Sequence, residues 1–177
     1  MEKHFFIGEG PEAEKLIASM IARREVARKA RLSLMHDYGS DGLILSGGRE
    51  GSIVGLSFKE KKDIPFLKGG NRIKGGYAYY PKMNTKKGKE LSKRLDDKDL
   101  TFSASHFIID ALKLERFAFS ARRMYVSVAG TSEDLKCILV SIPGTKEDED
   151  GPSSNFPSIP EWMREVKESE WLAAQGR

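Results

Sequence analysis

The longest regular pattern in this chain of 177 residues lies between Glu12 and His36. Apolar residues recur there at spacings of three, four or seven, which predicts a single long helix with one buried stripe. Acidic residues stand in its first turn and basic residues gather in its second half, where the helix dipole favours each sign of charge. The stripe, which a sheet or further helices must cover, consists of Leu16, Met20, Ala27, Ala30 and Leu34.

Short runs of β-branched and aromatic residues, separated by glycine-rich connectors, predict strands in most of the remaining chain. The first four after the opening strand form two hairpins, and the last three form an antiparallel meander. We therefore expect an α+β fold: an antiparallel sheet of two hairpins plus a C-terminal meander, with the long N-terminal helix and shorter helices packed on it. The predicted strands cover 3–7, 43–45, 52–58, 64–67, 73–80, 114–119, 124–129 and 135–142, and the predicted short helices cover 84–95, capped by Asn84 or Thr85, and 103–112.

The length and the 39% of hydrophobic residues suit one domain with its own core. We expect this domain over 1–145, followed by a flexible connector over 146–158 that is first acidic and then rich in Pro and Ser. Ser158-Ile159-Pro160-Glu161 has the capping-box pattern and predicts a C-terminal helix over 159–177. Two tryptophans in this segment would let the helix dock on its own domain or on a second subunit of a homodimer.

Cys137 is the single cysteine, and it lies in an apolar run. An intrachain disulfide is therefore excluded, and a buried thiol in a reducing compartment is expected. No apolar run approaches the roughly 20 residues that cross a bilayer, and the first residues lack the pattern of a signal peptide. These features predict a cytoplasmic protein without membrane contact.

Positive charge is concentrated in one part of the chain. Residues 59–94 hold twelve Lys or Arg and three acids, a local balance of +9, which leaves −5 for the rest of a chain whose formal net charge is +4. Such a field raises the local concentration of anionic partners. The alternative is a solvated face that keeps the protein soluble.

The stretch 69–90 combines two Gly-Gly pairs, three tyrosines and many lysines. Tyrosine rings can stack on bases, lysines can neutralise phosphates, and glycine lets the backbone approach a ligand closely. The alternative is a hairpin whose tyrosines pack over the sheet edge while its lysines keep that edge soluble. The predicted ligand-binding residues are Arg49, Arg72, Lys74, Tyr77, Tyr79, Lys82, Thr85, Lys86, Lys87 and Lys89.

Other chemistry has weaker support. The sequence around Gly88-Lys89 does not match the Walker phosphate-loop motif, because Met83 occupies the position of the first glycine and Glu90 that of the Ser or Thr. The three histidines and one cysteine show no spacing typical of metal ligands, so we predict no metal and no cofactor. No catalytic residue is predicted, although a small enzyme using His36 or His106 remains an alternative.

The segment 80–91, YPKMNTKKGKEL, resembles small accessory proteins encoded by tailed bacteriophages and prophages, on its Pro-Lys, Thr and Gly-Lys-Glu-Leu pattern. The resemblance implies a phage gene product in the bacterial host cytoplasm that binds and disables a host factor or sequesters a defence signal. The predicted function is thus a binding protein that holds a nucleotide signal or nucleic acid on its basic face. The alternative is a protein–protein inhibitor of a host nucleic-acid-handling or defence factor, which would be an acidic partner.

Overall fold

A computed structural model describes residues 3–46, 52–114, 124–130, 134–143, 147–148, 151–152 and 158–176. The chain divides into two compact units: unit 1 is Met1–Ile21 with Ala104–Arg177, and unit 2 is Ala22–Ser103. The sequence predicted one domain over 1–145 instead. The division follows from the long helix α1, Pro11–Tyr38, because Ile17 and Met20 are buried in its unit 1 part and Leu34 in its unit 2 part.

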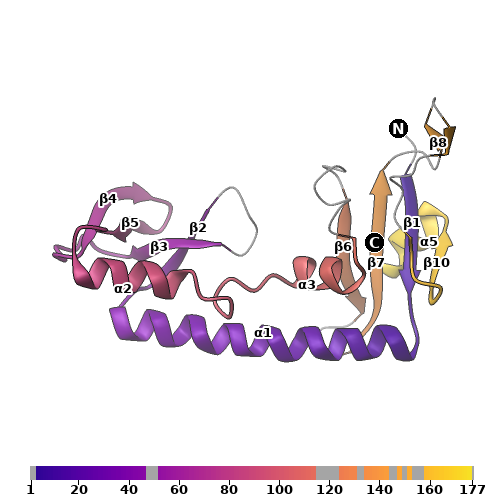
Figure 1. The fold of residues 1–177 in the computed structure, drawn as a ribbon, viewed down its shortest axis with the longest axis horizontal. Helices are drawn as coiled ribbons and strands as arrows, with labels where there is room; N and C mark the ends of the chain where they lie inside the picture. The colour runs from indigo at the N-terminus through magenta and orange to yellow at the C-terminus, as the bar shows by residue number, and fades with distance from the viewer. Residues whose placement is uncertain are drawn as a thin grey trace. The chain divides into compact units, whose positions relative to one another are not determined.

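The fold is α+β, as predicted, with two antiparallel four-stranded sheets in the described residues (Figure 1). Unit 1 contains β1 Lys3–Gly8, α3 Ala104–Ala111, β6 Tyr125–Gly130, β7 Leu135–Pro143, β10 Met163–Val166 and α5 Glu168–Ala174, together with the short pair β8 Glu147–Asp148 and β9 Gly151–Pro152. Unit 2 contains β2 Gly42–Leu45, β3 Ile53–Phe58, β4 Leu67–Ile73, β5 Gly76–Pro81 and α2 Lys86–Leu95.

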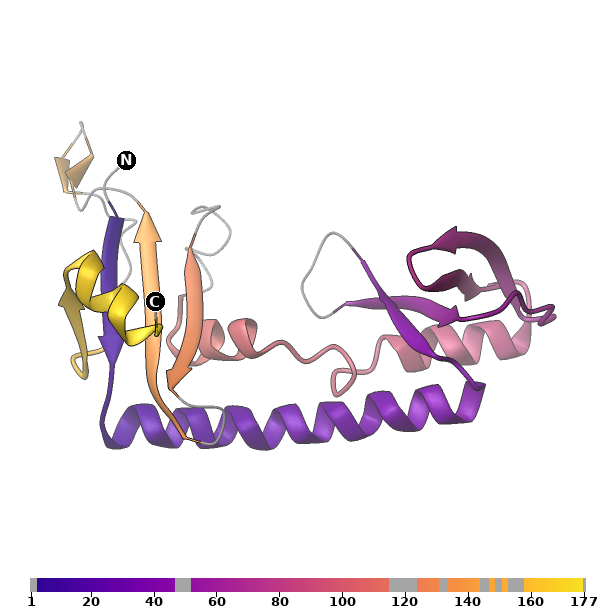
Figure 2. The same ribbon diagram turned by 180° about the vertical axis from the view of Figure 1, so that it is seen from behind.

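The sheet of unit 1 has the strand order β10-β1-β7-β6. Helix α5 lies against β1 (Figure 2), where the rings of Phe5 and Trp171 are 5.3 Å apart. Ile7 and Leu139 join these rings in one buried cluster. Consecutive residues of the central strands β1 and β7 are buried, so both faces of the sheet are covered at its centre, whereas the edge strands β6 and β10 keep exposed residues.

The C-terminal segment is where the sequence prediction fails most. The helix expected over 159–177 is instead the strand β10 followed by the short helix α5, whose N-cap residue Lys167 forms no side-chain cap. Met163–Val166 is a strand because it pairs antiparallel with the edge of β1, and this tertiary contact overrides the local helix signal at Ser158. Helix α5 packs on β1 of its own chain.

The sheet of unit 2 has the strand order β2-β3-β5-β4. One face of it, which we call the core face, carries Leu56, Phe58 and Tyr79 and packs against Leu34 of α1 and Leu91 of α2. Leu91 and Leu95 are buried, so α2 packs one face on the core while the lysines of its other face stay exposed. The opposite side of this sheet is called the outer face.

The second hairpin differs in register from the prediction. Its first strand is Leu67–Ile73 and not 64–67, and the chain turns at 74–75. Gly69 and Gly70, which the sequence placed in the turn, lie within β4, where the pairing with β5 shifts between Gly69 and Asn71. Both glycines have positive φ, +117° and +86°, so this bulge requires residues without a Cβ.

Candidate functional site

The junction between β5 and α2 is fixed by Thr85 and Gly88. The hydroxyl of Thr85 accepts a hydrogen bond from the Gly88 N–H at 3.0 Å and donates one to the Lys82 carbonyl at 2.9 Å, so Thr85 is the helix cap, as predicted. A side-chain carbon at Gly88 would collide with the Lys82 carbonyl oxygen. The close approach at Gly88 therefore holds the start of α2 against the end of β5.

An open pocket of about 370 Å³ lies at this junction, and we call it the junction pocket. Its lining residues are Lys68, Lys82, Met83 and Asn84. The Lys82 N–H donates to the Phe66 carbonyl at 2.8 Å, which fixes Lys82 beside β4. The pocket thus has the side chains of two lysines in its wall where the chain enters α2, and the exposed lining itself is mostly apolar.

The start of α2 adds further positive character. Lys86 and Lys87 occupy its first two positions, and their backbone N–H groups have no acceptor among the described residues. The first turn of α2 contains no acidic residue. The positive end of the helix dipole is therefore not neutralised by a carboxylate of its own helix, and it lies next to the two lysines of the junction pocket.

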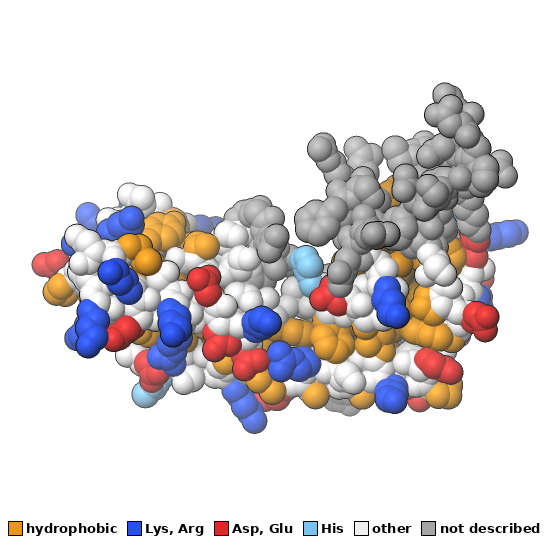
Figure 3. Space-filling model, viewed as in Figure 1, with side chains coloured by type: hydrophobic (Ala, Val, Ile, Leu, Met, Phe, Trp, Pro, Cys, Tyr) orange, Lys and Arg blue, Asp and Glu red, His pale blue; other side chains and the backbone are white. Residues whose placement is uncertain are grey.

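Most cations of 59–94 have no ionic partner. Arg94 pairs with Asp37 at 2.7 Å, whereas the other eleven Lys and Arg form no ion pair with a described carboxylate. Two of these eleven lie near aromatic rings: Lys61 is 6.0 Å from the Tyr77 ring centre and Lys87 is 5.9 Å from that of Phe66. On the face seen in Figure 3, the Lys and Arg side chains of unit 2, drawn in blue, are spread over the surface and do not gather in one hollow.

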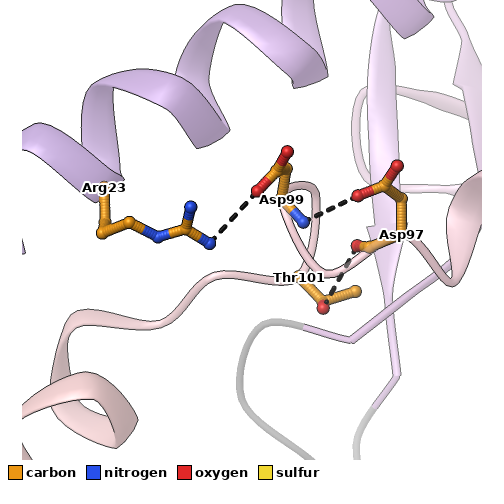
Figure 4. A network of polar contacts seen from close by, with 4 residues as sticks. All are labelled: Arg23, Asp97, Asp99 and Thr101. Atoms are coloured by element: carbon orange, nitrogen blue, oxygen red, sulfur yellow. Dashed lines mark hydrogen bonds and ion pairs between the residues drawn. The ribbon is translucent and has the colours of Figure 1, made fainter.

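The arginines of α1 behave differently. Arg31 donates to the carbonyls of Leu100 and Phe102 at 2.9 and 3.1 Å. Arg23 pairs with Asp99 at 3.1 Å, and the Asp99 N–H in turn donates to the Asp97 carboxylate at 2.8 Å (Figure 4). The guanidinium groups of these two arginines therefore hold the segment after α2 against α1.

The predicted site residues separate into two groups. Lys82 lines the junction pocket, Thr85 caps α2, and Lys86, Lys87 and Lys89 are exposed on that helix. Arg72 and Lys74 lie at the other end of the hairpin, about 17 Å away along the six residues of β5. Arg49 lies outside the described residues. The structure therefore does not bring Arg72 and Lys74 together with the predicted residues at the start of α2.

The two tyrosines predicted to contact a ligand are packing residues. Tyr79 is 5% exposed, its ring lies edge-on to Phe58 at 5.4 Å, and its hydroxyl bonds the backbone N–H and C=O of Lys62 at 2.7 and 3.0 Å. Tyr77 is partly buried against the same core. The cause is register: Tyr79 pairs with Leu56 and therefore faces the core, so its assignment as a ligand-binding residue is corrected.

Three residues of this region were missed from sequence. Lys68 and Asn84 line the junction pocket, and Tyr80 lies on the outer face beside it. The alternation of β5 already places Tyr80 opposite to Tyr79. Knowing that Leu56 pairs with Tyr79 would have shown that Tyr79 lies on the core face and Tyr80 on the outer face.

The other candidate reactive residues do not line the junction pocket. The side chain of His36 is 90% exposed, and its Nδ1 lies 3.6 Å from Asp37. His106 is exposed on α3, in unit 1. No group of His, Cys, Asp and Glu in the described part of the chain has the geometry of a metal site. Cys137 is buried as predicted, and this burial raises the pKa of its thiol.

Fold and site together define an α+β protein whose unit 2 displays unpaired cations around a strand-to-helix junction. The chain belongs to the family described as Family of unknown function (DUF5420), whose pattern matches residues 55–177. This match includes all four residues of the junction pocket. Neither a curated protein nor a solved structure matches the chain. Among the described helices, none is both long and apolar enough to traverse a bilayer.

Proposed function

We propose that this protein binds a phosphate-bearing ligand, a nucleotide signal or a nucleic acid, in the junction pocket. The observation that carries the proposal is the placement of Lys68 and Lys82 in one open pocket directly before the capped start of α2. Neither ammonium group has a described carboxylate partner, so both can pair with an incoming phosphate without breaking an existing ion pair.

The chemistry of the pocket suits an anion. Lysine side chains neutralise phosphate oxygens as point charges, and the first amides of a helix donate hydrogen bonds to them. The Asn84 side-chain amide at the pocket wall supplies a further neutral donor. The site would therefore hold its ligand by charge and hydrogen bonding and would lose affinity as salt concentration rises.

The biological role that we propose follows from the phage resemblance of 80–91. A protein that sequesters a nucleotide signal or covers a nucleic acid would counter a host defence in the bacterial cytoplasm. The structure gives several residues of that pattern a folding role as well, since Thr85 caps α2, Gly88 permits its close packing and Leu91 is buried.

One observation favours a second candidate, the inhibition of an acidic host protein. Met83 is 53% exposed at the wall of the junction pocket, and Ile73 is 36% exposed at the far end of the hairpin. Apolar side chains among unpaired cations are the composition of a surface that can dock an acidic protein.

The test uses tripolyphosphate, a polyanion without a base, and two double variants of the full chain. Lys68→Ala with Lys82→Ala removes the cations of the junction pocket, whereas Lys93→Ala with Lys98→Ala removes the same charge from exposed positions outside it. We expect tripolyphosphate to raise the melting temperature of the wild type and of the control, but not of the pocket variant.

Two results would contradict the proposal. If both double variants lose tripolyphosphate binding equally, the anion does not bind specifically in the junction pocket, and its affinity depends only on the net charge of the protein. If the wild type is not stabilised even at low salt, while an acidic polypeptide such as polyglutamate binds it, the second candidate is favoured.

A further inference from the structure

Tyr80 occupies the outer face of the unit 2 sheet. Its neighbour Tyr79 pairs with Leu56 on the core face, and successive side chains of a strand point to opposite faces. Both described helices of unit 2 contribute core residues on the other side of the sheet, Leu34 from α1 and Leu91 from α2. Tyr80 therefore stands on the side that these helices do not cover.

The ring of Tyr80 is bordered by glycines on both neighbouring strands. A Cβ built at Gly55 of β3 would lie 3.0 Å from its Cδ1 atom, and one built at Gly69 of β4 would lie 3.5 Å from its Cδ2 atom. Because neither position has a side chain, no neighbouring side chain flanks the ring there. The Tyr80 hydroxyl has no hydrogen-bond partner among the described residues, in contrast to that of Tyr79.

The junction pocket lies directly beside this ring. Lys68 is the cross-strand partner of Tyr80 and shares its face of the sheet, whereas Lys82 follows Tyr80 by two residues and lies just past the end of β5. These are the two lysines that line the pocket. The Tyr80 ring is thus close in the sheet to the pocket that the two lysines line.

We propose that Tyr80 is a platform on which an unpaired base stacks while the adjoining phosphate enters the junction pocket, and that the ligand is a single-stranded nucleic acid. This inference rests on the proposed function and names its ligand class. Stacking on an aromatic ring requires an exposed base face, which a single strand offers and a duplex hides.

The distribution of charge favours a strand over a single nucleotide. Eleven cations of 59–94 have no described carboxylate partner, and these are more than one nucleotide in the junction pocket could contact. Arg72 and Lys74, at the far end of the hairpin, would lie too far from Lys82 to share one phosphate with it. A polymer with regularly spaced phosphates can use both positions at once.

The experiment compares three probes at one salt concentration: a short single-stranded oligothymidylate, an abasic oligomer of the same length, and a duplex of that length. The wild type should bind the oligothymidylate at least about fivefold more tightly than the abasic oligomer, since stacking of one base contributes that much. Tyr80→Leu should remove this preference without weakening abasic binding. Tyr80→Phe should retain it, and so should Tyr125→Ala, which removes an exposed ring of unit 1.

The outcomes separate this inference from the function on which it rests. If the wild type binds the abasic oligomer and tripolyphosphate but shows no preference for bases, the inference is wrong and the proposed function stands. If the duplex binds as tightly as the single strand, the inference is also wrong. If neither the abasic oligomer nor tripolyphosphate binds, the proposed function fails. Equal abasic affinity of wild type and Tyr80→Leu confirms that the variant is folded.

Discussion

The two units of this chain differ in how they use charge. Unit 1 has 11 Lys or Arg and 16 Asp or Glu, a net −5, whereas unit 2 has 19 and 10, a net +9. In unit 1 the described pairs include Lys136 with Asp134 at 2.9 Å and Arg164 with Glu170 at 2.6 Å. In unit 2 the Lys and Arg that follow β3 form no ion pair with a described carboxylate, except for Arg94.

This difference supports the proposal that unit 2 binds an anionic ligand. Like charges repel one another across a folded surface and lower its stability, so an excess of unpaired cations has a cost that folding alone does not explain. The arginines of α1 show that this chain can pair its cations where structure requires it. The lysines around the junction pocket are therefore the residues that we expect to find their counter-charge in a ligand.

The largest expected effect tests whether the two units are separate cores. Leu139→Ala in β7 and Leu56→Ala in β3 each remove a fully buried side chain, and each should lower the free energy of unfolding by about 2–5 kcal/mol. Hydrogen exchange should accelerate in β1 and β7 for the first variant, and in β3 and β5 for the second. Equal acceleration in both sheets by either variant would show one cooperative core.

Local signals in the sequence predicted much of this fold. The period of α1 and the Thr85 cap act within a few residues, and the structure confirms the corresponding elements. Strand β10 was missed because its conformation depends on pairing with β1, which is more than 150 residues away in the chain. A helix signal at Ser158 could not reveal that distant edge.

The candidate site divides in the same way. Lys82 and Thr85 were predicted because the strand end and the helix cap are local features. The face on which each tyrosine lies depends on the partner strand, and Tyr79 was misplaced because the pairing of Leu56 with it is not visible from spacing alone. The bulge at Gly69 similarly depends on the register of β4 with β5.

The next effect concerns the junction that carries the proposed site. An alanine in a helix normally stabilises it relative to glycine, but at Gly88 the added methyl group would collide with the Lys82 carbonyl. Gly88→Ala should therefore lower the free energy of unfolding of unit 2 by about 1–3 kcal/mol in urea titrations. Lys89→Ala, at the adjacent exposed position, is the control and should leave it nearly unchanged. A neutral or stabilising Gly88→Ala would mean that α2 starts elsewhere.

A smaller effect sharpens the contrast between the core and outer faces of unit 2. Tyr79→Phe removes the hydroxyl that bonds both backbone groups of Lys62, and it should lower the free energy of unfolding by roughly 1–2 kcal/mol. Tyr80→Phe removes a hydroxyl without a described partner and should have little effect on chemical denaturation. Equal losses from the two variants would contradict the assignment of Tyr79 to the core and Tyr80 to the outer face.

The smallest effect concerns Arg94, the one cation of 59–94 that has a described ionic partner. Its hydrogen bond to Asp37 holds the pKa of that carboxyl below its ordinary value, with a smaller contribution from His36. A carboxyl with a lowered pKa in the folded state stabilises the fold above its unfolded pKa of about 3.9 and loses this contribution as pH falls through the folded value. The difference in melting temperature between the wild type and Arg94→Gln should therefore be larger at neutral pH and shrink in strong acid. A remainder should persist there, because the Arg94 guanidinium also lies 5.7 Å from the Tyr38 ring centre. The control is Lys93→Gln, at the neighbouring exposed position, which has no described carboxylate partner and should show no such pH dependence. The same pH trend in both variants would mean that the ion pair of Arg94 with Asp37 does not stabilise the fold.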